Sequence, residues 1–505
     1  MKPLRSPSLP AIAAATIAAV TFVACVPSQP FGGDAAEMQT VPYILGIAHP
    51  TGFPLFVLLG FFWSHAFAFG SVAWRLNALC AIYAGAAVGI GVACAGRLGI
   101  RWWIAVPAYF WFASTYVVWT HATHADVHDL LLALESAIVF ATIVWLQDGD
   151  RRALVAMAAC WGLALADHPN AIWLAPGMLV AVLLRRRDVR RGDLLRAGAA
   201  VAAGLSLYLY LPLRSSWIVA HGADPAARLA GIDGGPFWNA GNPSTWHGFL
   251  TVLTGSNFDT GHHLLGIFAP AQWQSYLWDI FTFTQGSYGS YAVVVAIAGL
   301  ATWYARDRRI ALVVGLLCLA AIPFSVVYRD VESDAARYRL LAIWWIPLLL
   351  ASAGGFGDDW RAELRRIGIA IFIVASWIGT LAANHTALFN NRNADGERHL
   401  ITQIAAAIPR GSIVVTTWLD ATPYAYGAYA DGSFADRTIV AAWPNDEAAN
   451  FRQWSSVAPV YVVVPQGTTL TGGTYAIART IDRYHVVYRY AGPAPTPRLR
   501  SLTRP

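Results

Sequence analysis

Two acidic residues lie three positions apart just after the first apolar stretch of this 505-residue chain. Asp34 and Glu37 would share one face of a helix, and His49 follows them directly before a proline. A carboxylate pair at a membrane surface could supply a general base or hold a metal ion. The same spacing also occurs where Asp34 caps the N-terminus of a short helix and Glu37 occupies its first turn. The spacing alone does not separate these interpretations.

A second cluster of polar side chains lies in the segment HATHADVHD, residues 121–129. Its histidines His121, His124 and His128 are spaced as i, i+3 and i+7, which predicts one stripe along a helix, with Asp126 beside it. Neutral imidazoles on one face of a helix can hold a divalent metal. We therefore treat Asp126, His124 and His128 as a candidate metal site. The alternative interpretation is a polar rim where a helix meets the membrane interface.

The composition places these residues in a membrane protein. Hydrophobic residues make up 56% of the chain and charged residues only 13%, about half the ~25% that is usual in soluble domains. The net charge of +6 rests almost entirely on arginines in short clusters between apolar stretches, which does not indicate a nucleic-acid partner. The five cysteines form no CxxC pair. Soluble, disordered and disulfide-scaffold classes are therefore excluded.

Apolar stretches of the length needed to cross a bilayer predict an α-helical polytopic protein with about eleven transmembrane helices. A further apolar segment, 51–69, is rich in aromatic residues and carries two histidines, which favours a helix lying in the interface. The predicted spans lie near 8–26, 75–96, 102–119, 127–146, 153–167, 169–184, 196–213, 289–305, 309–327, 340–356 and 367–384.

The distribution of arginine predicts the orientation. If the segment 51–69 does not cross the membrane, most basic residues, including the RRRDVRR cluster, lie in the loops on one side of the membrane. That side is expected to be the cytoplasm. We therefore expect a multi-pass protein of the inner (plasma) membrane, with its N-terminus cytoplasmic and everything after residue 385 extracytoplasmic. A signal peptide at 1–26 is the alternative for the first apolar stretch.

The last part of the chain has the pattern of a small soluble α/β unit. We expect a helix at 396–408, a strand at 411–418, an aromatic helix at 422–430, and further strands near 437–443, 458–465 and 483–490. The predicted domains are a transmembrane domain 1–384, a soluble domain 385–490 and a disordered, proline-rich tail 491–505. The soluble unit shows no phosphate loop and no acid–base pair, so we interpret it as an acceptor-binding or assembly module.

Several of these motifs together resemble one family of membrane proteins. The run D-x-x-E at 34–37, the run G-x-A-H-P-x-G-F-P-L-F at 46–56 and R-x-N at 75–77 are similar to a branch of the GT-C glycosyltransferases. That branch is related to the animal transmembrane protein O-mannosyltransferases. N-P-S-T-W at 242–246 resembles its N-P-x-T-W motif. The chain departs from the family in having D-A-A-E for D-S-G-E, and His128 where a tyrosine is usual.

The resemblance implies a GT-C fold whose first long outer loop carries the catalytic acid. The donor would be a sugar on a polyprenyl phosphate, with mannose suggested by the animal relatives. The acceptor would be a protein, lipid or glycan hydroxyl. A phosphate leaving group needs no proton, so one base suffices, and inversion at the anomeric carbon is expected. We predict Asp34 as that base and Glu37 as a second acid or its orienting partner.

The departing phosphate is expected to bind arginine, which pairs bidentately and keeps its charge. Arg75, Arg214 and Arg337 are the candidates on the outer side of the membrane, whereas Arg339 is better interpreted as an interfacial anchor.

Three further residues complete the predicted substrate-binding set. His49 and His168 each adjoin a proline near a predicted span, and His168 could equally be structural. Trp246 could stack on a sugar ring or anchor the chain in the interface. Some GT-C relatives use a divalent ion, so a metal ion is the one cofactor that the resemblance suggests. A lipid-linked glycan flippase and a surface-polysaccharide polymerase or ligase stay open as alternative functions.

Overall fold

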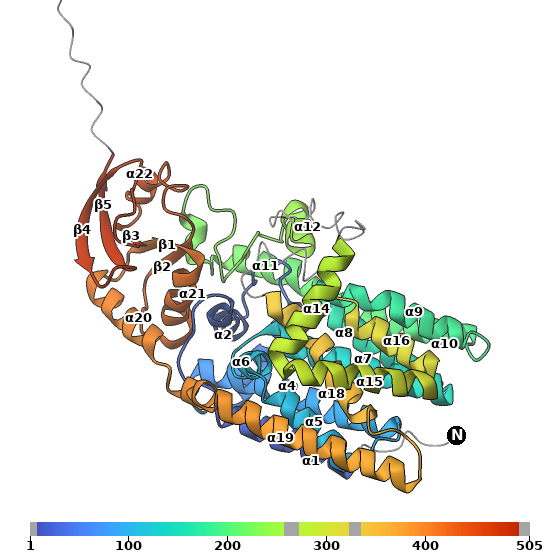
Figure 1. The fold of residues 1–505 in the computed structure, drawn as a ribbon. Helices are drawn as coiled ribbons and strands as arrows, with labels where there is room; N and C mark the ends of the chain where they lie inside the picture. The colour runs from blue at the N-terminus through green and yellow to red at the C-terminus, as the bar shows by residue number, and fades with distance from the viewer. Residues whose placement is uncertain (1–7, 257–271, 323–334, 494–505) are drawn as a thin grey trace, which may run out of the picture.

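The computed structural model describes residues 8–256, 272–322 and 335–493. It consists of a long helical bundle and, at one end of it, a small sheet domain formed by the C-terminal part of the chain (Figure 1). The bundle helices are α1 (Leu9–Val23), α4 (Val72–Arg97), α5 (Trp102–Ala113), α7 (Val127–Asp148), α8 (Arg151–Asp167), α9 (Ala175–Leu184), α10 (Arg191–Leu205), α15 (Ser290–Arg306), α16 (Arg308–Leu319), α18 (Leu340–Ser352) and α19 (Trp360–Asn390).

Each of the eleven predicted spans overlaps one of these helices, although several are short. The end of the predicted span 309–327, after residue 322, lies outside the described residues. Four helical stretches of the described chain are long and apolar enough to cross a membrane: Val72–Arg97, Val127–Asp148, Arg191–His221 and Trp360–Asn390. A fifth results if the helix pair Leu277–Tyr288 and Ser290–Arg306, bent by 116°, counts as one span. The chain is therefore a multi-pass membrane protein. The count of eleven spans stays a prediction.

The bundle packs closely where α1 crosses α4. A Cβ atom on Gly85 would lie 2.6 Å from the Cβ atom of Ala19, and one on Gly89 would lie 2.6 Å from that of Ala15. Small residues on both helices thus let the two backbones approach, as is common between helices in membranes. This contact holds the first helix against the bundle and fixes where the first loop begins.

The connections between the bundle helices carry shorter helices. The first loop forms α2 (Asp34–Ile44) and α3 (Pro54–Ala66), the second of which lies within the segment predicted as an interfacial helix. Further connecting helices in the described ranges are α6 (Tyr116–Ala122), α11 (Tyr210–His221), α12 (Trp246–Thr254) and α14 (Gln272–Tyr288). Short 3₁₀ helices lie at η1 (Pro169–Leu174), η2 (Ser206–Leu209), η3 (Pro225–Arg228), η5 (Ala335–Arg339) and η6 (Asn391–Asn393).

The C-terminal domain is a five-stranded sheet of order β2-β1-β3-β5-β4. Strand β1 pairs in parallel with β2 and β3, whereas β5 pairs antiparallel with β3 and β4. The predicted helices and strands all have counterparts, and β4 and α22 were not predicted. The elements are α20 (Gly396–Ala407), β1 (Ile413–Thr416), α21 (Trp418–Tyr426), η7 (Gly427–Asp431), β2 (Thr438–Ala441), α22 (Phe451–Trp454), β3 (Val460–Val464), β4 (Thr474–Thr480) and β5 (Val486–Gly492).

The C-terminal domain shares a hydrophobic core with the first loop. Met38 and Phe56 of the loop belong to the same buried cluster as Tyr424 and Tyr426 of α21. The hydroxyl of Tyr426 also accepts a hydrogen bond from the backbone N–H of Ala73, at 3.1 Å. Figure 1 shows α21 beside α2. The domain is therefore packed against the loop that carries the predicted catalytic acid.

Candidate functional site

Asp34 is the first residue of α2, and its side chain contacts distant parts of the chain. The helix cap is Gly33, and no side chain caps this helix, so the interpretation of Asp34 as a cap is wrong. Its Oδ2 instead accepts a hydrogen bond from Nη1 of Arg337 at 2.9 Å, and its Oδ1 accepts one from the indole N–H of Trp418 at 3.1 Å. Both carboxylate oxygens are thus held in place.

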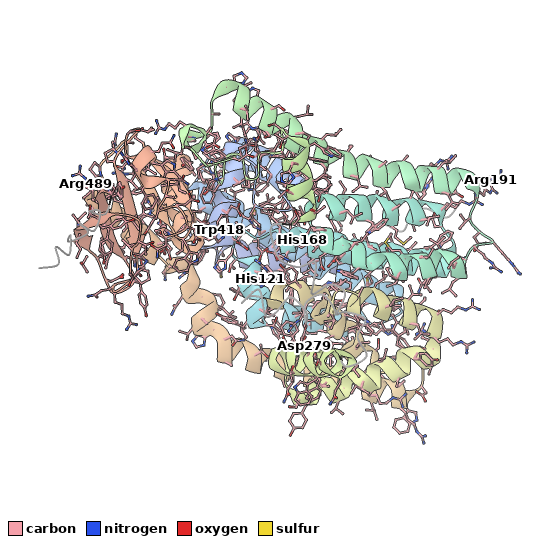
Figure 2. The ribbon with its side chains drawn as sticks, turned by 90° about the horizontal axis from the view of Figure 1, so that it is seen from above. His121, His168, Arg191, Asp279, Trp418 and Arg489 are labelled. Atoms are coloured by element: carbon pink, nitrogen blue, oxygen red, sulfur yellow. The ribbon has the colours of Figure 1, made fainter. Side chains whose placement is uncertain are left out.

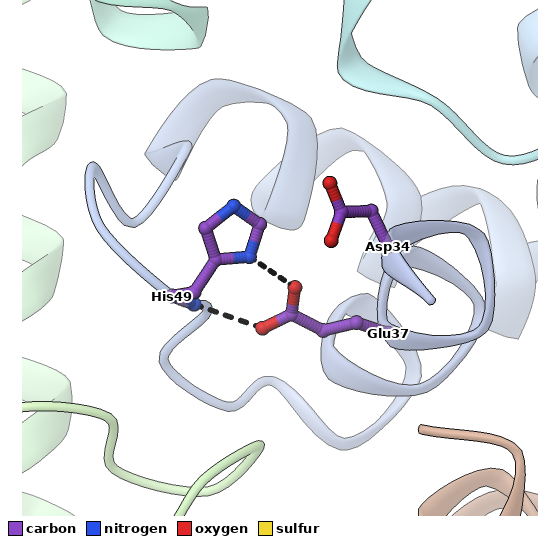
Figure 3. Close-up of side chains that lie close together, drawn as sticks. All are labelled: Asp34, Glu37 and His49. Carbon is purple, nitrogen blue, oxygen red and sulfur yellow. Dashed lines mark hydrogen bonds and ion pairs between the residues drawn. The ribbon is translucent and has the colours of Figure 1, made fainter. Parts of the chain in front are cut away.

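Glu37 lies one turn further along α2 and is fully buried. Its Oε1 accepts a hydrogen bond from the backbone N–H of His49 at 2.8 Å, and its Oε2 pairs with Nδ1 of the same histidine. Figure 3 shows both interactions, with the carboxylate of Asp34 beside them. Glu37 therefore binds both the backbone and the ring of His49, which suits the orienting role that the sequence left open for it.

Opposite charges stabilise the ionised forms of this group. Burial alone would raise the pKa of Asp34, but the charges of His49 and Arg337 and the hydrogen bond from Trp418 lower it below its usual value. Burial would lower the pKa of His49, but the carboxylate of Glu37 outweighs it and raises that pKa to about 9. At neutral pH the site thus holds an ionised Asp34 next to an imidazolium.

Asp34 and His49 lie on the wall of a cavity of about 1350 Å³. The cavity lies between the bundle and the C-terminal domain, and residues from several regions of the sequence line it. Figure 2 shows three of the lining residues, His121, His168 and Trp418, near one another, far from Arg191 and Arg489 at the two ends of the molecule. The lining includes Asp34, His49, His121, His124, Asp126, His128, His168, Arg337, Tyr338, Glu397, Trp418, Asp420, Trp443, Tyr484 and His485.

The predicted histidine stripe is wrong, because the chain breaks between two helices there. Helix α6 ends at Ala122 and α7 begins at Val127, so the histidines do not share one helix. Asp126 caps α7 and accepts a hydrogen bond from the backbone N–H of His128 at 2.9 Å. Its two oxygens also bond Nδ1 of His121 at 2.8 Å and Nδ1 of His128 at 2.7 Å.

The predicted metal ligands are consequently not gathered around one point. His124 packs its ring against Phe31, with the ring centroids 3.8 Å apart. Within the described ranges, the one group of acids and histidines close enough to share a metal ion is a different one, formed by Asp34, Glu37 and His49. Their ligand atoms lie within 4.8 Å of one another.

His168 lines the cavity, as one of its two predicted roles requires. Its Nδ1 accepts a hydrogen bond from the backbone N–H of Asn170 at 3.0 Å, and it precedes the turn η1. The ring stacks on Phe53 at 5.7 Å and lies 4.8 Å from the ring of His128. His168 is thus held by its neighbours while one side of it is open to the cavity.

Two predicted phosphate ligands lie outside the residues that line this cavity. Arg75 donates hydrogen bonds to the backbone carbonyls of Ser64 and Ser71. Arg214 donates to the carbonyl of Leu45 at 2.6 Å, and its guanidinium lies 4.2 Å from the ring centre of Trp217. In the described structure both arginines thus bind backbone carbonyl groups. Their role in substrate binding stays a prediction.

Trp246 also lies apart from the cavity lining. It begins α12, is 73% exposed and packs against Phe249 at 5.9 Å. Such exposure fits an interfacial anchor as well as a sugar contact, and its role stays a prediction. Arg339, which we interpret as an anchor, pairs with Asp279 at 3.2 Å.

The C-terminal domain contributes cavity residues that the sequence patterns did not indicate. Trp418 follows the end of β1 by two positions, and Asp420 follows it on α21. Nε2 of His485 lies 3.4 Å from Asp420 and its Nδ1 lies 2.9 Å from Asp482, and these partners raise the pKa of His485 to about 9. Ligands of open α/β sheets bind beyond the carboxyl ends of parallel strands. The position of Trp418 at such an end was the available signal.

Solved structures share this fold. ArnT from Cupriavidus metallidurans in the apo state aligns with a TM-score of 0.53 at 13% sequence identity, covering 95% of this chain and 97% of that one. The same enzyme bound to undecaprenyl phosphate aligns with a TM-score of 0.51 over the same shares, also at 13% identity. The chain therefore has the GT-C fold that the sequence resemblance implied.

Sequence comparison extends the resemblance to particular relatives. Residues 34–191 match the model of the protein O-mannosyl-transferase TMEM260 N-terminal domain. The mouse (Mus musculus) protein O-mannosyl-transferase TMEM260 is 30% identical over 257 residues, which are 49% of this chain and 34% of that protein. The Dictyostelium discoideum protein O-mannosyl-transferase tmem260 is 28% identical over 102 residues, 20% of this chain and 12% of that protein. The chain thus spans well under half the length of these relatives, and the predicted resemblance to this branch is confirmed.

Proposed function

We propose that this protein is a glycosyltransferase that moves a sugar from a polyprenyl-phosphate carrier to a hydroxyl group at the extracytoplasmic face of the membrane. The observation that carries the proposal is the ionised carboxylate of Asp34, held on the cavity wall next to Arg337 and His49. The names of the relatives support the reaction class and mannose as the sugar. The undecaprenyl phosphate bound by a protein of the same fold supports the type of carrier.

In this mechanism Asp34 is the general base. An ionised carboxylate offers about four lone pairs, of which Trp418 and Arg337 use two, so Asp34 can still accept a proton from the attacking hydroxyl. The acceptor oxygen forms its bond to the anomeric carbon as the bond from that carbon to the phosphate oxygen breaks. The phosphate leaves as an anion on the opposite side, so the configuration inverts.

Arg337 and His49 are the cations that would meet the donor phosphate. Arg337 binds one carboxylate oxygen with Nη1, and His49 carries a proton at neutral pH. Both lower the pKa of Asp34. A bound phosphate would draw their charge away from Asp34 and raise its basicity when a base is needed. The lowered pKa of Asp34 is thus compatible with base catalysis.

A divalent ion would be held by Asp34, Glu37 and His49, if one takes part. Their mixed oxygen and nitrogen donors suit zinc or manganese. The ion would supply positive charge for the departing phosphate. Because His49 is protonated at neutral pH, ion binding at this place would have to release its proton, so affinity should increase with pH.

The test uses the full chain, purified in detergent, with labelled polyprenyl-phosphate mannose and a pool of peptide and glycolipid acceptors. We expect transfer by the wild type and a loss of about 10²–10⁴-fold in Asp34→Asn. Asp188→Asn is the matched control, because Asp188 also pairs with an arginine, Arg185 at 2.8 Å, but is half exposed and lies outside the cavity lining. It should transfer like the wild type.

Three outcomes would count against the proposal or its parts. Equal transfer by Asp34→Asn would remove Asp34 as the base. Donor lipid that moves across proteoliposomes without transfer would favour a flippase instead. Parallel reactions with a chelator test whether transfer requires a metal ion. Unchanged transfer would exclude a required ion at Asp34, Glu37 and His49.

A further inference from the structure

Trp418 of the C-terminal domain contacts the predicted catalytic carboxylate directly. It is the first residue of α21, and its indole N–H donates to Oδ1 of Asp34 at 3.1 Å, across a sequence separation of 384 residues. Arg337 occupies the other oxygen, Oδ2. With one donor on each oxygen, the plane of the carboxylate has a defined orientation.

The ring of Trp418 is itself held from two sides. It stacks on Phe237, which is fully buried, with ring centroids 5.5 Å apart and an interplanar angle of 18°. It meets the ring of His49 edge-on at 5.8 Å. The indole therefore has little freedom to turn away from Asp34.

The backbone next to Trp418 is tied to the residues that precede Asp34. The N–H of Gly33 donates to the carbonyl oxygen of Leu419 at 3.4 Å. A Cβ atom on Gly32 would lie 3.3 Å from the side chain of Leu419. The two glycines thus let α21 approach the start of α2 closely. The spacing between Trp418 and Asp34 follows from this backbone contact as well as from the side chains.

We propose that Trp418 is a positioning residue for Asp34, which makes the C-terminal domain an integral part of the active site. The inference rests on the proposed function. An indole N–H is a donor only and carries no charge, so a phosphate does not attract it as it attracts a guanidinium. When the donor phosphate draws on Arg337, Trp418 still holds Asp34 in its orientation toward the acceptor.

The test compares Trp418→Phe, which keeps an aromatic ring but lacks the N–H donor, with the wild type. We expect kcat to fall about tenfold, the scale of a hydrogen bond to a charged group, while KM for the donor changes less than about twofold. Since the lost hydrogen bond lowers the pKa of Asp34, its removal raises that pKa. The acidic limb of the pH–rate profile should therefore move to higher pH.

Trp454→Phe is the matched control. Trp454 lies in the same domain, and its indole N–H donates to the carbonyl of Ala230 at 2.8 Å, outside the cavity lining. This variant loses the same kind of hydrogen bond, and its acidic limb should stay in place. An acidic limb that moves equally in Trp454→Phe, or stays in place in Trp418→Phe, would overturn the proposal.

A second measurement does not depend on transfer. A carbodiimide modifies protonated carboxyl groups, and the modification of Asp34 can be followed against pH by peptide mass spectrometry. Trp418→Phe should shift the midpoint to higher pH, and an unchanged midpoint would overturn the proposal. If Trp418→Phe does not fold, benzothienylalanine at position 418 keeps the indole shape without the N–H. Absence of transfer by the wild type would refute the proposed function, while the carbodiimide result would still decide the role of Trp418.

Discussion

The carboxylates of Asp34 and Glu37 lie one helical turn apart, yet their surroundings assign them different tasks. Glu37 is fully buried and uses both oxygens on His49, so it cannot reach a substrate without releasing that histidine. Asp34 is open to the cavity and keeps lone pairs for a ligand. At the scale of single residues, burial and partners therefore leave Asp34, and not Glu37, free to act as the proposed base.

The pair of Glu37 and His49 predicts a pH-dependent stability. The pKa of His49 is about 9 in the folded protein, above its ordinary value of 6.5. Because protonated His49 pairs with Glu37 in the folded protein, the pair stabilises the fold. This stabilisation is fully present below pH 6.5 and is lost as the pH rises through about 9. Glu37→Gln should lower the free energy of unfolding at pH 6 by about 3 kcal/mol. It should also flatten the stability curve between pH 6.5 and 9.

Thermal unfolding in detergent across this pH range checks the expectation. Glu363→Gln is the control, because Glu363 pairs with Arg366 at 2.8 Å but its side chain is 50% exposed. An exposed pair contributes little. A Glu37→Gln curve that keeps the wild-type slope above pH 6.5 would contradict the assignment of the raised pKa to Glu37.

At the scale of helices, close contacts decide where the loops begin. Gly85 and Gly89 let α4 touch α1, which sets the start of the first loop. The break between α6 and α7 has a comparable effect, because it turns Asp126 into a helix cap that bonds His121 and His128. Both arrangements depend on how two helices are placed relative to each other, and not on the properties of a single residue.

The crossing of α1 and α4 predicts that Gly85→Val is destabilising. The added side chain would meet the Cβ atom and the backbone of Ala19, so the helices must separate, at a cost of about 1–3 kcal/mol. Gly96→Val is the matched control on the same helix, because nothing lies within 4 Å of a Cβ atom there. Unfolding temperatures in detergent compare the two. Equal stability of both variants would refute close packing at Gly85.

At the scale of the whole molecule, the cavity lies between two parts of the chain that look independent in sequence. The first loop and the C-terminal domain share a buried cluster, and both line the cavity. The interpretation of the C-terminal unit as an acceptor-binding or assembly module stays a prediction, but the domain does carry residues that line the cavity. The domain reaches the site through residues that follow its first strand.

The predicted orientation places this cavity outside the cytoplasm, and cysteine labelling in intact cells tests it. Ser456→Cys in the C-terminal domain should react with a membrane-impermeant maleimide, whereas Arg187→Cys should react only after permeabilisation. Both positions are exposed. The native chain is the control, because four of its cysteines are buried and Cys160 is half-buried. The reverse labelling pattern would invert the topology.

Local patterns in the sequence were sufficient to predict the helices and most strands of the sheet. They were also sufficient to single out Asp34, which lines the cavity. Hydropathy located a helix in each predicted span, and alternation located four of the five strands. The spacing of Asp34 and Glu37 placed them on one turn, because helical periodicity is a property of neighbouring residues. The GT-C fold also follows from the sequence, because its motifs are short runs of neighbouring residues.

Only the tertiary structure decided which groups surround Asp34. Arg337 lies 303 residues away and Trp418 lies 384 residues away, and no periodic pattern connects such positions. The same holds for the break between α6 and α7, which separates His121 from His128 although their spacing predicts one stripe along a helix. Sequence periodicity reports which face of an element is apolar. The packing of those faces, and the backbone contacts that small residues such as Gly32 and Gly33 allow, determine which side chains meet.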